Sequence, residues 1–385
     1  MDSRKSLRRR IIASLCAAAM VVTMLPANAL KAEAKANNHP LPKNSIEPQF
    51  PTYDVPDIMD FVAGAREDDP YVTASIPLKD RVQSQRVNDY ANTEAQSVAL
   101  SSMRFTPDSA FSYAFTYWQY LDILATWGPH QGDGIIKTPV PAAVDAAHKN
   151  GTKSLGMVFI DHHVSQNQFL AKNSDGTFPV VDKLIEVEQA YGFDGWFYNF
   201  EVTLNGNQAA TQRAKELLVY HQQVKPEGSV TMWYDDMTNG GQLTYADHFN
   251  SNNTDWMKWN GQRTNDYYFT NYNWTVNEVE TSRQTALNLG ISPYEIFHTL
   301  QCQRDGGYLD TYFAGKDHGL FQKGAAKASV GFFVPDVTMN ISKTPEDFLM
   351  HDNRFWVGYT GIRPNQTPEA PTTTASRSGR ASRPI

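Results

Sequence analysis

Residues 193–201 read Phe193-Asp-Gly-Trp-Phe-Tyr-Asn-Phe-Glu201, a stretch that indicates a buried strand with polar groups at its end. In a strand, successive side chains point to opposite faces, so Phe197, Asn199 and Glu201 share one face while only aromatic rings occupy the other. The aromatic face is expected to pack against helices. The opposite face then points into a barrel or crevice, where an amide or carboxyl without a partner costs roughly 1–3 kcal/mol. A fold retains such groups mainly where they have a use.

Short apolar runs alternate with helical patterns along the rest of the chain, which is typical of parallel βαβ units. We predict strands at residues 112–119, 154–160, 196–201, 229–235, 267–272, 295–301 and 329–335, and an eighth at 354–357. Helices are predicted at 140–150, 181–191, 209–224 and 277–289, and a glycine follows three of them as a stop signal. The sequence therefore predicts an α/β fold, a single (β/α)8 TIM barrel, over residues 55–366.

The two ends of the chain differ in composition from this central part. Residues 1–34 combine a basic head, an apolar middle and small-x-small sites, as expected of a secretory signal peptide. Residues 35–54 are predicted to be a linker, and the polar residues 367–385 a disordered tail. Cys16 lies within the signal and leaves Cys302 alone, so no intramolecular disulfide is expected. We expect a secreted protein, with no stable membrane insertion after signal removal.

Charge and composition restrict the kinds of partner. A net charge of -7 supplies no basic surface for a nucleic-acid backbone, so no nucleic acid is expected as a partner. Aromatic residues make up 12% of the chain, and flat rings commonly stack on the apolar faces of sugars. His162 and His163 follow Asp161, but adjacent histidines in an extended segment face opposite ways and no third ligand is suitably spaced. We predict no metal and no cofactor.

The predicted carboxyl ends of the strands carry many polar and aromatic groups, and barrel enzymes collect their functional residues at this rim. Sugars are the ligand class that such a mixture suits. The candidates for binding substrate are Trp118, Asp122, Trp233, Asp235, Phe269, Asn271 and Trp274, with Trp127 as a further ring.

The pairing of Asn199 with Glu201 indicates a particular kind of glycoside hydrolysis. That reaction usually needs one carboxyl group to protonate the leaving oxygen and a second to act as nucleophile. Glu201 can be the acid, but the amide of Asn199 cannot attack. The pairing makes sense where the substrate supplies the nucleophile, as the carbonyl oxygen of a 2-acetamido group does in substrate-assisted catalysis. Asn199 would then hold and polarise the acetamide.

The segment 194–201 resembles the Asn-x-Glu signature of the glycoside hydrolase family 85 endo-β-N-acetylglucosaminidases. Further stretches similar to that family occur in order at 75–78, 117–122, 146–151, 233–235, 269–272 and 355–358. The resemblance implies cleavage of the β-1,4 bond between the two core N-acetylglucosamines of N-glycans, on glycoproteins or free. It also implies retention through an oxazolinium intermediate and, in many members, transglycosylation.

The resemblance also implies roles for single residues. Glu201 would be the general acid and then the general base, and Asn199 would orient the acetamide. Tyr234 would hydrogen-bond near the reacting acetamide, and Trp274 would line the substrate groove. Family members commonly continue into β-sandwich domains beyond the barrel, whereas the barrel predicted here is followed by the polar residues 367–385.

Two alternatives stay open. A chitinase-like barrel hydrolase carries the signature Asp-Gly-x-Asp-x-Asp-x-Glu; Asp194 and Gly195 fit it, but Phe197 and Asn199 replace the two later acids. A secreted glycan-binding barrel without turnover would bind N-glycans and yield no product. The first alternative differs from the main hypothesis in its substrate, and the second in the absence of a product.

Overall fold

The computed structural model describes residues 52–65, 73–80, 94–101, 115–127, 134–161, 166–204, 208–302, 320–322 and 325–357. The predicted signal peptide, most of the predicted linker and the predicted tail lie outside these residues. The last part of the predicted linker, Thr52–Tyr53, forms strand β1, and helix α2 (Val55–Met59) follows at once. Ordered structure therefore begins before residue 55.

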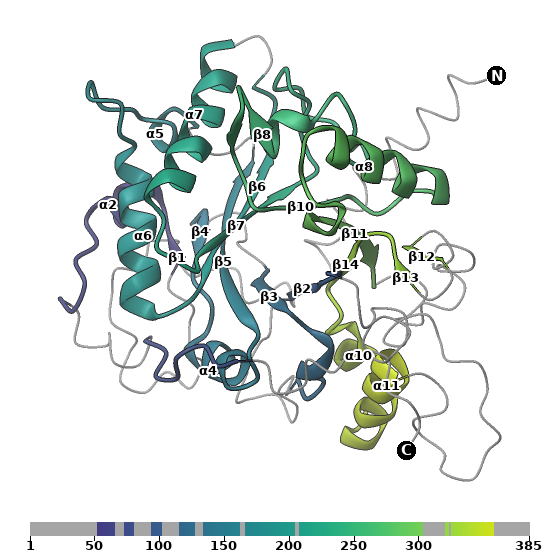
Figure 1. The fold of residues 1–385 in the computed structure, drawn as a ribbon. Coiled ribbons are helices and arrows are strands. Elements are labelled where there is room, and N and C mark those ends of the chain that lie inside the picture. The colour runs from purple at the N-terminus through teal and green to yellow at the C-terminus, as the bar shows by residue number, and fades with distance from the viewer. Residues whose placement is uncertain are drawn as a thin grey trace.

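Eight parallel strands close into a barrel (Figure 1). In order around the barrel they are β2 (Ser97–Ser101), β3 (Ile123–Thr126), β5 (Lys153–Asp161), β6 (Gly195–Glu201), β7 (Val230–Tyr234), β10 (Tyr267–Phe269), β11 (Ile296–Gln301) and β14 (Ser329–Phe333). β14 pairs with β2 in the register Val330 to Ser97, which closes the ring. The predicted (β/α)8 barrel is confirmed, and its parallel strands bring their carboxyl ends to one rim.

Two of the predicted strands are wrong. Within the predicted strand 112–119 the described part leads into a 3-10 turn, η2 (Trp118–Tyr120), and the predicted strand 354–357 is the last turn of helix α11 (Pro345–Val357). The rings of these two segments pack together, since Tyr120 stacks on Trp356 at 6.5 Å between centroids. Aromatic residues, which are common in strands, here pack in a cluster outside the sheet. The strands β2 and β3 were missed because they are short and carry small residues.

The four predicted helices are confirmed within one or two residues of their bounds. They are α4 (Pro141–Lys149), α6 (Pro179–Tyr191), α7 (Gln208–Val224) and α8 (Val276–Asn288). Gly192 ends α6 in the left-handed conformation, with a φ of 75°, as a helix-stopping glycine does. Within the described residues no helix is long and apolar enough to span a bilayer.

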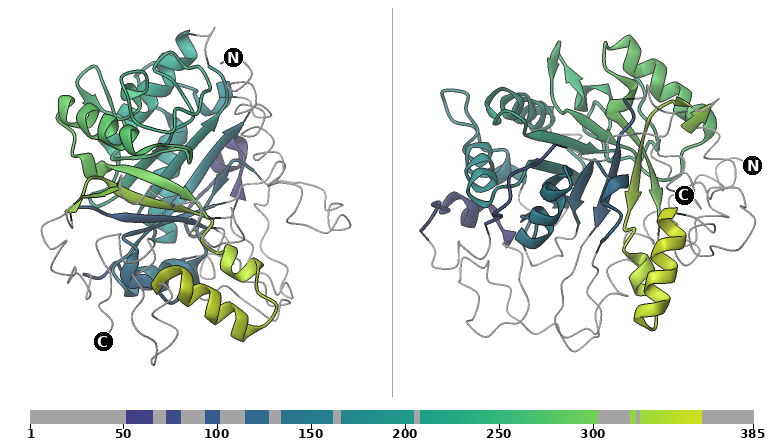
Figure 2. Two further views of the ribbon diagram at one scale, coloured as in Figure 1. Left: turned by 90° about the vertical axis from the view of Figure 1, so that its right-hand side faces the viewer. Right: turned by 60° about the horizontal axis from the view of Figure 1, so that its bottom comes forward.

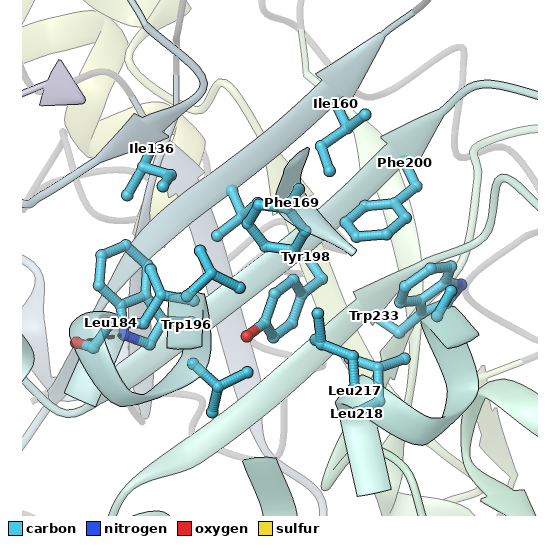
Figure 3. Packing of buried hydrophobic residues seen from close by; sticks show 14 of the residues in the cluster. Ile136, Ile160, Phe169, Leu184, Trp196, Tyr198, Phe200, Leu217, Leu218 and Trp233 are labelled. Carbon is cyan, nitrogen blue, oxygen red and sulfur yellow. Dashed lines mark hydrogen bonds between the residues drawn. The ribbon is translucent and has the colours of Figure 1, made fainter. Parts of the chain in front are cut away.

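The outer face of β6 forms the centre of the largest apolar cluster (Figure 3). Trp196, Tyr198 and Phe200 point outward from this strand and are buried against helices α6 and α7, where Leu184 and Leu217 meet them. The alternation predicted for this strand is therefore present. Its inner face fills the barrel, where Phe197 meets Phe269 edge-on at 5.2 Å.

Smaller elements extend the barrel at its edges. They are β4 (Ile136–Lys137), α5 (Gln166–Phe169), η3 (Thr254–Trp256), β8 (Lys258–Trp259), β9 (Gln262–Arg263), η4 (Pro293–Glu295), β12 (Phe321–Gln322), β13 (Ala325–Ala326) and α10 (Val337–Asn340). β1 and β4 add two antiparallel strands to β5. Helices α10 and α11 lie together on the side of the barrel away from α6 and α7 (Figures 1 and 2).

Candidate active site

Asn199 and Glu201 lie at the carboxyl end of β6, on its inner face. The Nδ2 of Asn199 donates to Oε1 of Glu201 at 3.0 Å. The Asn199 side chain is buried, and its Oδ1 has no hydrogen-bond partner among the described residues. Glu201 is half-buried and accepts a second hydrogen bond, from the hydroxyl of Tyr245 to Oε2 at 3.0 Å. An enclosed carbonyl oxygen without a donor beside a reachable carboxyl group is a place for a ligand that offers an N–H.

Tyr234 ends the next strand, β7, and is tied to the strand after it. Its hydroxyl donates to Oδ1 of Asn271 at 2.9 Å, and Nδ2 of Asn271 donates to Oδ1 of Asp247 at 2.7 Å. Burial, followed by the neighbouring Tyr272 and Glu201, raises the pKa of Tyr234 well above its ordinary value. Tyr234 is therefore a neutral hydroxyl close to the Asn199 and Glu201 pair.

Tyr245 and Asp247 were missed by sequence reasoning. Both belong to the segment between β7 and β10, which is far longer than the 2–6 residues usual for such connections. Long loops at this rim often carry function, and the length was the available signal. Asp247 has a left-handed backbone, with a φ of 63°, which asparagine, aspartate and glycine tolerate best.

The two aspartates that follow Tyr234 lie behind the strand ends, out of solvent. Asp235 accepts a hydrogen bond from the hydroxyl of the outward-facing Tyr268 at 2.7 Å, and burial raises its pKa to about 7. Asp236 accepts from the backbone N–H of Phe200 at 2.5 Å, and burial, then the charge of Glu201, raises its pKa well above the ordinary value. Both side chains are fully buried, so the structure places Asp235 as a support for the rim and away from a ligand.

Trp118 and Asp122 lie at the opposite end of the barrel from Glu201. Asp122 directly precedes β3, and its carboxylate accepts the backbone N–H of Ser97 at the start of β2. Trp118 is buried in η2 against Phe115. The sequence predicts a strand before these two residues, whereas the structure has strand β3 after them, so they lie away from the rim that carries Glu201.

Three further candidates belong to the core. Trp233 faces outward from β7 and stacks on Trp256, with ring centroids 4.3 Å apart. Trp274 is fully buried and donates its indole N–H to the Thr299 carbonyl at 2.7 Å. Phe269 is enclosed within the barrel. These three rings are fully buried and present no surface on which a sugar could stack. Among the residues predicted to bind substrate, Asn271 is the one that hydrogen-bonds to the Tyr234 hydroxyl.

A line of other aromatic rings borders the Asn199 and Glu201 pair. Phe159 on β5 lies beside Asn199 in the register of the sheet, and Trp127 directly follows β3. Neighbouring centroids along the line are 5.0 to 6.3 Å apart, and the rings in order are Phe159, Trp127, Phe333, Tyr272, Tyr234 and Tyr245. Most of these rings are only partly buried, which suits contact with the apolar face of a sugar.

No group of three or more metal-ligating side chains occurs in the part of the chain that the structure describes. His162 and His163 lie outside that part. The described site consists of the half-buried carboxyl group of Glu201, the buried Asp161 beside it in the sheet, a buried amide, phenolic hydroxyls and rings. The Glu201 carboxyl group can exchange a proton with a ligand, the amide and hydroxyls can hydrogen-bond to its polar groups, and the rings can contact its apolar face.

Comparisons with known proteins agree with this arrangement. The sequence model of Glycosyl hydrolase family 85 matches residues 94–383. The cytosolic endo-β-N-acetylglucosaminidase of Mus musculus is 27% identical over 258 residues, which are 63% of this chain and 32% of the relative. The Gallus gallus protein of the same name is 26% identical, over 75% of this chain and 39% of the relative. The chain thus spans roughly a third of the length of the curated relatives it matches.

A solved structure extends the likeness to the fold. The glycoside hydrolase domain of Endo-D from Streptococcus pneumoniae R6 superposes with a TM-score of 0.71 and 26% identity, over 87% of this chain and 54% of that one. The names of the curated relatives correct one prediction: they are called cytosolic, which contradicts the expected secretion of this chain. A basic head with a short apolar run was not sufficient to assign the compartment. The family match covers nearly all of the barrel, and the chain belongs to glycosyl hydrolase family 85.

Proposed function

We propose that the chain is an endo-β-N-acetylglucosaminidase that cuts between the two core N-acetylglucosamines of N-glycans by substrate-assisted catalysis. The observation that supports this most strongly is the Asn199 and Glu201 pair, an amide 3.0 Å from a carboxyl group, with the amide oxygen buried and lacking a donor among the described residues. The relatives in Mus musculus and Gallus gallus are named endo-β-N-acetylglucosaminidases, which agrees with cleavage of this bond.

In the first step the carbonyl oxygen of the substrate's 2-acetamido group attacks the anomeric carbon, and the bond to the leaving sugar breaks. Glu201 gives its proton to the leaving oxygen. The Oδ1 of Asn199 accepts the acetamide N–H, which turns the carbonyl oxygen toward the anomeric carbon and favours the positive charge that develops on the oxazolinium ring. Tyr234 borders the site beside Tyr245, whose hydroxyl hydrogen-bonds to Glu201, with the two ring centroids 6.2 Å apart.

In the second step Glu201, now ionised, takes a proton from water, and the water oxygen bonds to the anomeric carbon. The oxazolinium ring opens and restores the acetamide with retained configuration. A sugar hydroxyl in place of water would give transglycosylation. The hydrogen bonds that Asn199 and Tyr245 donate to Glu201 hold its two oxygens in fixed positions for both proton transfers.

Asp161 is the observation that favours a second mechanism. It lies directly beside Glu201 in the pairing of β5 with β6, and it is buried. A carboxylate there could act as the nucleophile of an ordinary two-carboxylate glycosidase. That mechanism would not need the acetamide, so a substrate with a 2-hydroxyl in place of the 2-acetamido group distinguishes the two. Turnover of the 2-hydroxyl substrate at the parent rate would favour Asp161.

Two variants test the proposed roles. Glu201→Gln is expected to abolish cleavage of a high-mannose glycopeptide, because glutamine cannot donate the proton. Asn199→Ala is expected to abolish cleavage of the glycopeptide while leaving some use of a preformed sugar oxazoline, in which the ring has already closed. Cleavage of the glycopeptide by Asn199→Ala at the parent rate would contradict the substrate-assisted mechanism. Chitin oligomers serve as the control, and cleavage of these alone would favour the chitinase-like alternative.

A further inference from the structure

A chain of three side chains leads from the loop between β7 and β10 to the rim of the barrel. Asp247 accepts from Nδ2 of Asn271 at 2.7 Å, and Oδ1 of Asn271 accepts from the hydroxyl of Tyr234 at 2.9 Å. The same Asp247 oxygen accepts the backbone N–H of Asn273 at 2.9 Å. A backbone donor has a fixed position, so this oxygen of Asp247 is held as an acceptor facing Asn271.

The position of Asp247 determines which way the Asn271 amide faces. If the amide turned over, its oxygen would face the Asp247 oxygen at the 2.7 Å now spanned by a hydrogen bond, and two acceptors would oppose each other. The amide is therefore held with its oxygen toward Tyr234. Both Asn271 and Tyr234 are buried, so no bulk water competes for these groups.

The orientation of Asn271 in turn determines the hydrogen of Tyr234. A phenol has one hydrogen, and here it points at Asn271. Tyr272 is a second polar neighbour, and burial, followed by the charge and hydrogen bond of Tyr272, raises the pKa of Tyr234, so the phenol keeps its hydrogen. With that hydrogen donated to Asn271, the lone pairs of the Tyr234 oxygen can only accept.

We infer that Asp247 is a positioning residue, which through Asn271 keeps the Tyr234 hydroxyl oriented as an acceptor for an N–H or O–H of the bound sugar. This inference rests on the proposed function, because it takes a sugar of the N-glycan core as the donor. Asp247 itself touches neither the sugar nor the reacting atoms in this role. Its effect is on the direction of one hydrogen.

The backbone at Asp247 allows a matched pair of variants. With a φ of 63°, both glycine and asparagine are tolerated at this position. Asp247→Asn keeps an oxygen that can accept from Asn271 and from the Asn273 N–H, since a single Asp247 oxygen serves both. Asp247→Gly removes the acceptor. Both variants tolerate the backbone conformation and both remove the negative charge, but only Asp247→Gly removes the hydrogen-bond acceptor. A difference between them therefore reports the hydrogen bond.

The test measures kcat and KM on a high-mannose glycopeptide for the parent, Asp247→Asn and Asp247→Gly, each alone and combined with Tyr234→Phe. Asp247→Gly is expected to lower kcat about tenfold, the value of one hydrogen bond of ordinary strength, and Asp247→Asn less than threefold. In the Tyr234→Phe background Asp247→Gly is expected to have no further effect on kcat, because there is no hydroxyl left to orient.

Three results would overturn the inference: equal kcat for Asp247→Gly and the parent, equal losses in Asp247→Gly and Asp247→Asn, or an undiminished loss in the Tyr234→Phe background. If Asp247→Gly does not fold, Asn271→Leu breaks the same chain from its other end, and its loss of kcat must also disappear with Tyr234→Phe. Glu201→Gln in the same set of variants distinguishes a failure of the inference about Asp247 from a failure of the proposed function, because turnover by Glu201→Gln would contradict the proposed function itself.

Discussion

Replacing Asn199 by Asp tests the geometry of the site most sharply, because it converts an amide and a carboxyl group into two carboxyl groups. The Nδ2 of Asn199 lies 3.0 Å from Oε1 of Glu201, so the new oxygen would take the place of a hydrogen-bond donor at that distance. The position is almost completely buried, with 1% of the side chain exposed. Two ionised groups are strongly disfavoured there.

The magnitude follows from the separation. Two unit charges about 3 Å apart repel by about 5 kcal/mol at an effective dielectric constant of about 20. Glu201 is only partly buried, so solvent screens part of this, and we take about 2.7 kcal/mol, about two pKa units, as the effect, of which about 1.2 kcal/mol falls between pH 5 and pH 8. In Asn199→Asp the two carboxyl groups therefore keep one proton between them to a higher pH than a carboxyl group of the unfolded chain does. The protonated pair is tolerated in the fold at low pH, and the variant loses stability as the pH rises and the proton leaves.

The assay is thermal unfolding at pH 5 and pH 8 for the parent, Asn199→Asp and Asn199→Ala. Asn199→Asp is expected to lose at least about 2 °C more in Tm, relative to the parent, at pH 8 than at pH 5. Asn199→Ala removes the donor without adding a charge, so its difference from the parent should be the same at both pH values. Equal differences for Asn199→Asp at pH 5 and pH 8 would refute the close contact with Glu201.

Two further predictions concern stability. Burial raises the pKa of Glu188 on α6 to about 8, so the protonated carboxyl stabilises the fold at low pH and this contribution is lost as the pH rises from the pKa of the unfolded chain through 8. Between pH 5 and pH 9 the free energy of unfolding of Glu188→Gln should therefore rise relative to that of the parent by on the order of 2–4 kcal/mol, measured by urea unfolding. A difference between the two proteins that is the same at both pH values would contradict the raised pKa. Gly195 has a φ of 131°, and a Cβ there would lie 1.9 Å from the Val230 carbonyl oxygen, so Gly195→Ala should lose more than about 3 kcal/mol. Its control, Gly228→Ala, has a φ of 84° and open space, and should lose only about 1–2 kcal/mol; equal losses would contradict the close approach.

Strand β6 and the helices could be predicted because local pattern and packing agree there. The aromatic face of β6 lies against α6 and α7, as its alternation indicates, and Asn199 and Glu201 point inward. Residues 112–119 misled because Tyr117 and Trp118 are typical of strands, yet they belong to the ring cluster around Trp356. The strand propensity of an aromatic residue shows that it suits a half-buried surface, but it does not show whether that surface belongs to a sheet or to a helix and a turn.

The candidate site could be predicted only where it follows directly from a strand end. Tyr245 and Asp247 are contributed by a loop whose path depends on tertiary contacts, and sequence reasoning had no means of placing them beside Glu201 and Asn271. The opposite error arose with Trp274, because a tryptophan near a strand end can either stack on a ligand or fill the core. Here its indole N–H is satisfied by a backbone carbonyl, which identifies it as core.

The most direct measurement of the proposed cleavage is a mass spectrum of the products formed from a glycoprotein with one defined high-mannose N-glycan. We expect the polypeptide to keep a single N-acetylglucosamine on its asparagine, while the released glycan carries the other at its reducing end. The Glu201→Gln protein should leave the substrate intact. A polypeptide without any sugar, or an untouched glycoprotein beside cleaved chitin oligomers, would contradict the proposed cleavage.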